Sequence, residues 1–234
     1  MKKGEFMAKK LNQYKHALLF LYFPFYLMAF AYVEKRVPDK IHVIHCVIDR
    51  YIPFLEVFII PYLLWFLYIA VTGFYFFFKE KEVFCRLMYF GMAGMTIFII
   101  VSYFYPNGLE LRPTSFSRDN IFIELTKLIY RADTPTNVLP SIHVFNSLGA
   151  YSAIRNSRSF HKNKPVRIGA LVLTIAIILS TMFLKQHSVV DVFTAVILSS
   201  VVYDFVYHGR LEKIQAGMEG LRYKKLKHCL HNEK

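Results

Sequence analysis

Two histidines stand at the edges of long apolar runs, and one of them is followed four residues later by a carboxylate. His143 lies in "NVLPSIHVFNS", and His187 and Asp191 lie in "STMFLKQHSVVD". At a spacing of four, His187 and Asp191 share one face of a helix. The carboxylate can then accept one imidazole N–H and leave the other nitrogen free to act as a nucleophile or a base. Because ionisable side chains within apolar segments are rare and usually functional, these three residues are the first candidates for a catalytic site.

The apolar runs that carry these residues are long enough to cross a membrane. Hydrophobic residues make up 55% of the 234 positions and charged residues 19%. A ~30 Å hydrocarbon layer needs about 20 apolar residues in a helix. Runs near that length lie at 17–33, 53–78, 87–105, 141–154, 166–184 and 188–207, and the fourth is the shortest. We therefore predict an all-α fold in which 1–234 is a single integral-membrane domain, a bundle of six transmembrane helices.

The net charge of +13 is distributed in a way that argues against a nucleic-acid partner. With the N-terminus in the cytoplasm, the cytoplasmic segments hold 20 of the 29 Lys and Arg residues. This is the bias expected of a membrane protein in that orientation. Segment 208–234 is then a basic cytoplasmic tail that lies against anionic lipid head groups. We expect a multi-pass protein of the plasma membrane with both termini in the cytoplasm. The lysine-rich leader and the lack of a small-residue cleavage site favour a retained first span.

This topology brings the candidate residues to the outer end of the bundle. Between His143 and His187 the chain crosses the membrane inward and returns to the face that it left. The third span ends on the same face, so Arg112, in the long connection that follows it, lies there too. Pro140 suits the first position of a helix. The free N–H groups of Ser141 and its neighbours would then point outward at a helix N-terminus, where a phosphate can bind.

The motifs resemble those of the type-2 phosphatidic acid phosphatase superfamily, whose soluble relatives include the vanadium haloperoxidases. That family carries Lys-x6-Arg-Pro, Pro-Ser-x-His and Ser-Arg-x5-His-x3-Asp. Here "PSIH" (140–143) matches the second motif fully, "HSVVD" (187–191) the end of the third, and "RP" (112–113) the end of the first. The resemblance covers about residues 50–207, which would form a phosphatase-like core. It implies a six-helix bundle of the phosphatase and haloperoxidase type.

The resemblance also implies a role for each matching residue. His187 would be the nucleophile that takes the phosphoryl group, Asp191 would orient it, and His143 would protonate the leaving oxygen. Arg112 and Ser141 would bind the phosphate, with no metal and no cofactor. The implied enzyme hydrolyses a lipid phosphate monoester or diphosphate through a phosphohistidine intermediate on the outer face of the membrane.

Two positions depart from the family pattern. The lysine of the first motif falls on Tyr105, and the arginine of the third motif falls on Thr181. Two cations that would bind phosphate are therefore missing. We predict that Lys185, close to the nucleophilic histidine, supplies part of the lost charge. Arg118 and Arg131 in the outer connection (106–139) are the other candidates.

Three other functions remain open at this point. The run "STMFLKQHSVVD", together with isoleucine at 142, is more similar to the inositolphosphotransferase branch, which implies transfer of a phospho-head group to a lipid hydroxyl. The missing cations favour a non-catalytic lipid-binding or transport protein on the same fold. A metal hydrolase would use His143, His187 and Asp191 as ligands. His42, His45 and Cys46 in "KIHVIHCVID" have side chains that can bind a metal. No further ligand lies nearby in the sequence, so a half-buried outer helix is the better interpretation of this segment.

The orientation can be tested by cysteine labelling in a variant that lacks the native cysteines. Cysteines introduced near Asn107 should react with a membrane-impermeant thiol reagent applied from outside, and cysteines near Asn163 should not. Labelling of intact and permeabilised cells measures the difference. The opposite pattern would move the candidate site to the cytoplasmic face.

Overall fold

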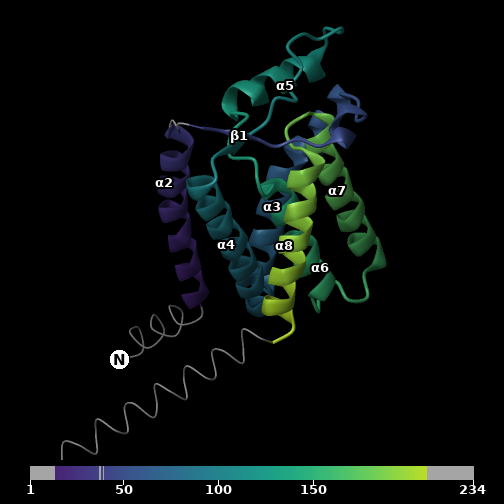
Figure 1. Cartoon of the computed structure of the whole chain (residues 1–234). Helices are drawn as coiled ribbons and strands as arrows, with labels where there is room; N and C mark the ends of the chain where they lie inside the picture. The colour runs from purple at the N-terminus through teal and green to yellow at the C-terminus, as the bar shows by residue number, and fades with distance from the viewer. Residues whose placement is uncertain (1–13, 37, 39, 210–234) are drawn as a thin grey trace, which may run out of the picture.

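The structure, a computed structural model, describes residues 14–36, 38 and 40–209 (Figure 1). The first 13 residues and nearly all of the predicted cytoplasmic tail, from residue 210 on, lie outside the described residues. The remainder is mostly helical. Its longer helices are α2 (Tyr22–Lys35), α3 (Ile59–Lys79), α4 (Lys81–Phe104), α5 (Ile121–Ala132), α6 (Ile142–Asn156), α7 (Lys164–Phe183) and α8 (Val189–Tyr207).

Among the described residues, five helical stretches are long and apolar enough to cross a membrane. In two of them a 3-10 helix leads directly into the α-helix: η1 (Lys15–Leu21) into α2 and η3 (Glu56–Phe58) into α3. The five stretches are Lys15–Lys35, Glu56–Lys79, Lys81–Phe104, Lys164–Phe183 and Val189–Tyr207. They correspond to the first, second, third, fifth and sixth predicted spans. The prediction of a helical, multi-pass membrane protein is confirmed at this level.

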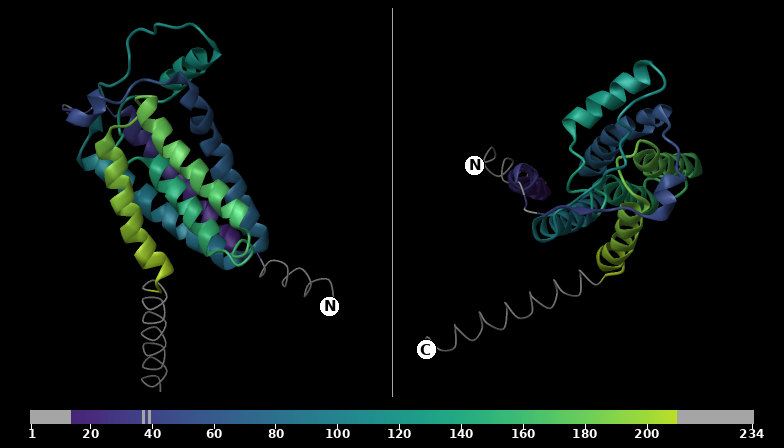
Figure 2. Two further views of the ribbon diagram at one scale, coloured as in Figure 1. Left: turned by 90° about the vertical axis from the view of Figure 1, so that its right-hand side faces the viewer. Right: turned by 45° about the horizontal axis from the view of Figure 1, so that its top comes forward.

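The fourth predicted span is the exception. Helix α6 has 15 residues, and at 1.5 Å per residue it reaches only about 22 Å, less than the ~30 Å of a hydrocarbon layer. The surroundings of α6 compensate for its short length, because the helix packs against α3, α4, α7 and α8 in the interior of the bundle (Figure 2). Small residues allow this close packing: Ala150 and Ala153 are completely buried. A helix enclosed by other helices does not need to match the bilayer thickness along its own length.

The two ends of the bundle carry different connections. At one end Glu80, between α3 and α4, accepts hydrogen bonds from the backbone N–H groups of Arg158 (3.0 Å) and Ser159 (3.1 Å) in the turn between α6 and α7. At the other end the strands β1 (His42–Val43) and β2 (Asn107–Gly108) pair in parallel. Helix α5 lies across this second end (Figure 1). Arg112, His143 and His187 therefore share one end of the bundle. Asn107 is 1% exposed, so exposed Ser117 is the better labelling position in that connection.

The contact between α4 and α6 depends on two glycines. A Cβ on Gly94 would lie 2.1 Å from the Phe145 ring, and a Cβ on Gly149 would lie 2.6 Å from the Phe90 ring. The rings of Phe90 and Phe145 stack at a centroid distance of 4.5 Å and are almost completely buried. An added Cβ at either position would therefore displace a packed aromatic ring. Close helix contacts through small residues are typical of membrane bundles.

We expect Gly94→Ala to lower the free energy of unfolding by about 1–3 kcal/mol, because overpacking forces the buried Phe145 ring out of its position. Thermal unfolding of the purified protein in detergent measures the change. Gly91→Ala is the matched control on the same helix, since a Cβ there would meet only Asn146 Oδ1 at 3.9 Å. Equal melting temperatures for the two variants would show that the contact is not tight.

Candidate active site

The turn between α7 and α8 holds His187 by its backbone. The amide groups of Gln186 and His187 both donate to the carbonyl of Thr181, at 2.9 and 3.0 Å. Ser188 caps α8 and forms a reciprocal capping box with Asp191. Two orphan amides of the first turn of α8 are thereby satisfied. The turn cannot reorient without breaking these bonds, so the backbone position of His187 is fixed.

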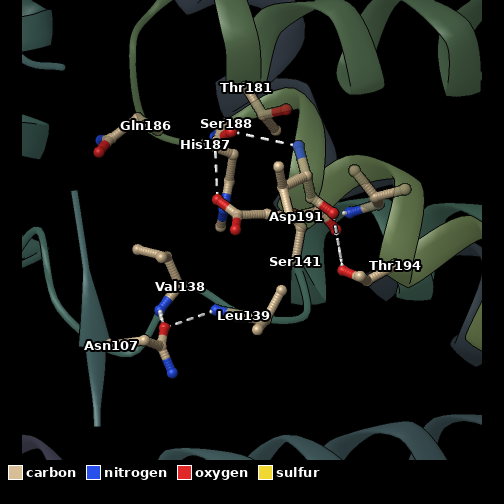
Figure 3. A network of polar contacts seen from close by, with 12 residues as sticks. Asn107, Val138, Leu139, Ser141, Thr181, Gln186, His187, Ser188, Asp191 and Thr194 are labelled. Carbon is tan, nitrogen blue, oxygen red and sulfur yellow. Dashed lines mark hydrogen bonds and ion pairs between the residues drawn. The ribbon is translucent and has the colours of Figure 1, made fainter. Parts of the chain in front are cut away.

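The predicted His187–Asp191 pair is present. His187 Nδ1 lies 3.4 Å from Asp191 Oδ2, and the aspartate side chain is completely buried. The same carboxylate oxygen accepts the backbone N–H of Ser188 at 2.8 Å (Figure 3). Within the described part of the chain, His187 Nδ1 and Asp191 Oδ1 have no hydrogen-bond partner. A small rotation of the imidazole would make the Nδ1–H bond to Asp191 and leave Nε2 free.

His143, in the first turn of α6, lies beside the pair. Its ring contacts the indole of Trp65, at a centroid distance of 4.4 Å, and the ring of Tyr62, at 4.8 Å. The His143 and His187 rings are 5.8 Å apart and inclined at 60°. Both histidines line a cavity of about 500 Å³, which we call the histidine cavity. The predicted convergence of these two imidazoles is therefore present, in a space large enough for a small polar group.

The charge of the histidine cavity differs from that expected for a phosphate site. Glu34, at the end of α2, accepts hydrogen bonds from Thr134 Oγ1 and from Asn137 Nδ2 (3.1 Å). The Asp133 carboxylate accepts a long hydrogen bond from the Tyr62 hydroxyl at 3.5 Å. Desolvation raises the pKa of Asp133. Two carboxylates but no lysine or arginine are among the described residues that line this cavity.

Arg112 lies close to the cavity without lining it. Its guanidinium donates to the carbonyls of Tyr130 (3.1 Å) and Asp133 (2.8 Å) and stacks over the Tyr130 ring at 4.6 Å. It also donates to Oε1 of Gln186, a residue that does line the cavity. Burial lowers the pKa of Arg112 from its usual value. The arginine therefore approaches the site through Gln186, whose importance the sequence analysis missed.

Ser141 and Lys185 do not take the positions predicted for them. Ser141 is the N-cap of α6, one residue after Pro140, so the proline precedes the helix and is not its first residue. Its hydroxyl accepts from Val144 N, and its own N–H donates to the carbonyl of Asp191 at 3.4 Å. The side chain is completely buried. The Ser141 N–H thus joins α6 to α8 and is not free to bind a phosphate.

The Lys185 side chain binds backbone carbonyl groups and does not point to the predicted phosphate site. Its ammonium group donates to the carbonyls of Asp49, at 2.8 Å, and Ile52. Its backbone has φ +52°, a left-handed conformation that is uncommon for residues other than glycine. This conformation turns the chain tightly just before His187. Burial lowers the pKa of the lysine. Because Lys185 does not line the histidine cavity, this geometry does not support it as the replacement cation.

The other residues predicted to replace the missing cations, and those that could bind a metal, also contact other groups. Arg118 forms a salt bridge with Glu56 at 2.9 Å, and Arg131 donates to the carbonyl of Lys127. His42 stacks on Tyr105 at a centroid distance of 4.2 Å. No group of three His, Cys, Asp or Glu residues in the described part of the chain is placed to share a metal ion. The alternative of a metal hydrolase therefore has no ligand set among those residues.

Asp49 is a site residue that sequence reasoning missed. Its carboxylate is 2% exposed and accepts the hydroxyl of Ser188 (2.6 Å) and the N–H groups of Val189 (2.9 Å) and Cys46 (2.7 Å). Although burial opposes ionisation, these hydrogen bonds hold the pKa of Asp49 below its usual value. A segment before the second span thereby fixes the first turn of α8, which His187 and the N-cap Ser188 directly precede. Asp49 stands next to an arginine in a connection that also contains two histidines, so the sequence gives no signal of this role.

Asn107 plays a similar part on the other side of the site. Its side-chain oxygen accepts the N–H groups of Val138 (2.8 Å) and Leu139 (2.9 Å), so it fixes the segment that leads into α6 (Figure 3).

Comparison of the chain with protein-family models, with curated protein sequences and with solved structures gives no match. The geometry of the site therefore carries the functional argument.

We expect Asp49→Ala to lower the free energy of unfolding by about 2 kcal/mol or more, because it leaves several buried donors without an acceptor. Thermal unfolding in detergent measures the loss, and hydrogen exchange at Val189 localises it. Asp119→Ala is the control, since Asp119 is exposed in the connection between α4 and α5. Similar melting temperatures for the two variants would contradict the role given to Asp49.

Proposed function

We propose that this protein is a membrane enzyme that cleaves a lipid phosphate ester through a phosphohistidine intermediate, with hydrolysis as its reaction. The observation that carries the proposal is the cavity that His143 and His187 line together, with a buried carboxylate 3.4 Å behind the second imidazole. Three of the helices around this cavity, α2, α3 and α4, are long and apolar enough to lie in a membrane. A substrate that reaches the site from the bilayer would be a lipid.

The chemistry assigns one role to each of the three residues. His187 Nε2 attacks phosphorus and forms a P–N bond as the P–O bond to the lipid alcohol breaks. His143 gives a proton to the departing oxygen, and Asp191 stabilises the imidazolium that forms on His187. Water then attacks the phosphohistidine, the P–N bond breaks, and phosphate leaves. His143, now neutral, takes a proton from that water, which restores the starting state.

The charge of the cavity favours a second candidate, the transfer of a phospho-head group to a lipid hydroxyl. A phosphate monoester carries a charge of about −1.5 to −2 near neutral pH. Such a group is poorly matched to a cavity lined by Glu34 and Asp133 and by no described lysine or arginine. A phosphodiester carries only one negative charge and would enter this cavity at lower cost. The same His187 nucleophile would then hold the head group until an acceptor hydroxyl arrives.

The proposal includes the topology and family expected from the sequence. In it, α6 acts as a sixth, short span within a bundle of the phosphatase and haloperoxidase type. The site faces the outside of the plasma membrane. Support comes from the order of the motif residues and from their meeting at one end of the bundle. Arg112 would act on the phosphate through Gln186, which accepts its guanidinium N–H.

The decisive experiment is to trap the intermediate. Purified protein is incubated with lipids labelled with ³²P in the phosphate, quenched in base to preserve phosphohistidine, and assayed for bound label, free phosphate and new phospholipids. His187→Ala should abolish both the label on the protein and turnover. His143→Ala should slow lipid substrates by about 10²–10⁴-fold but slow an activated aryl phosphate much less, because that leaving group needs little protonation.

His161→Ala is the control, since His161 is exposed in the turn at the opposite end of the bundle. Turnover that persists in His187→Ala, or an equal loss on both substrate types in His143→Ala, would contradict the assigned roles. Free phosphate as the product supports hydrolysis, and a new phospholipid in its place supports transfer. A folded protein that neither turns over nor takes up label would point to a lipid binder.

A further inference from the structure

A second cavity, of about 290 Å³, adjoins the histidine cavity between α2, α3, α4 and α6. Its walls are almost wholly apolar, with Phe23, Ile69, Phe84 and Met88 among the residues that line it. We call it the apolar cavity. Trp65, Met95 and Asn146 line both cavities. The two spaces therefore adjoin each other at these three side chains.

The apolar cavity is kept open by glycines on two of its walls. A Cβ on Gly73 of α3 would meet no atom within 4 Å, and a Cβ on Gly91 of α4 would meet only Asn146 Oδ1 at 3.9 Å. The hydroxyl of Tyr22 contacts Thr96 Oγ1 (2.9 Å) and the carbonyl of Met92 (3.2 Å), which joins α2 to α4. Helix α2 thus closes one side of the space without filling it. These glycines are unlike Gly94 and Gly149, which are packed tightly.

Asn146 adds a polar group where the two cavities meet. It lies three residues, about one turn of helix, after His143, and its side chain forms no hydrogen bond with the described part of the chain. An amide that has no partner between apolar walls is costly unless a ligand supplies one. Lipids carry such a group, an ester or amide carbonyl, between the head and the acyl chain.

We propose that the apolar cavity holds one acyl chain of the lipid whose phosphate occupies the histidine cavity, with Asn146 bonded to the carbonyl that joins them. The identity of the head group rests on the proposed function, whereas the chain site does not require turnover. Transfer of a chain from the bilayer gains little hydrophobic free energy, since both surroundings are apolar. The gain comes from dispersion contacts with cavity walls that would otherwise face a void. The bound chain would hold the phosphorus at a fixed distance from His187.

The test is photo-crosslinking of the purified full chain in nanodiscs. The probes are phosphatidic acid and a phosphodiester lipid, each with a diazirine midway along one acyl chain, and labelled peptides are identified by mass spectrometry. Label should concentrate on the cavity-facing positions of α3 and α4. Gly91→Leu places a side chain in the cavity and should reduce that label about tenfold or more, because small changes in the fit of an apolar pocket have effects of this order.

Gly169→Leu is the matched control. A Cβ there also meets no atom within 4 Å, but the residue lies on α7 and lines neither cavity. Gly73→Leu, from the opposite wall, repeats the test if Gly91→Leu does not fold. Label spread over the exposed helix faces, or equal labelling of the Gly91→Leu and Gly169→Leu proteins, would overturn the chain site. Cavity labelling without phosphohistidine would uphold the chain site and count against the proposed reaction.

Discussion

The arrangement of the site depends on the two buried carboxylates that hold the first turn of α8. Asp191 accepts the N–H of Ser188, and Asp49 accepts the Ser188 hydroxyl and the N–H of Val189. Negative charge at a helix N-terminus is favoured by the helix dipole, and more strongly where solvent is excluded. Each carboxylate thus obtains a stabilising environment that it would lack elsewhere in an apolar bundle. His187 precedes this turn directly, so its position follows from the two carboxylates.

The same constraint links helices that are distant in the sequence. The segment containing Asp49 precedes the second span, and its carbonyl also accepts the Lys185 ammonium group. The N-terminus of α6 is joined to α8 by the bond from the Ser141 N–H to the Asp191 carbonyl. Unpaired polar groups are costly in an apolar interior. Satisfying them across helices therefore fixes the distance between His143 and His187 without a direct bond between the two imidazoles.

The sequence predicted the parts of this structure that follow from local patterns. Five spans, the His187–Asp191 pair and the meeting of the two histidines could all be deduced from run lengths, spacing and the number of crossings. The directions in which individual side chains point could not be deduced in this way. Lys185 is adjacent to the site in sequence, but a left-handed backbone and two carbonyl acceptors take its ammonium group elsewhere. Asp49 and Asn107 act on segments far along the chain, and no short-range signal indicates such contacts.

The structure shows which contacts Thr181 and Tyr105 make, the two positions where the sequence departs from the motifs that it resembles. Thr181 is completely buried; its hydroxyl donates to the Ile178 carbonyl at 2.7 Å, and its own carbonyl holds the amides of Gln186 and His187. An arginine there would have to leave the interior or bring in a counter-charge. Tyr105, by contrast, is 40% exposed and stacks on His42. In the proposed enzyme, positive field at a bound phosphate would come from Arg112 through Gln186 and from the imidazoles, since no described lysine or arginine lines the cavity. An enzyme built in this way would act best on esters that carry little charge.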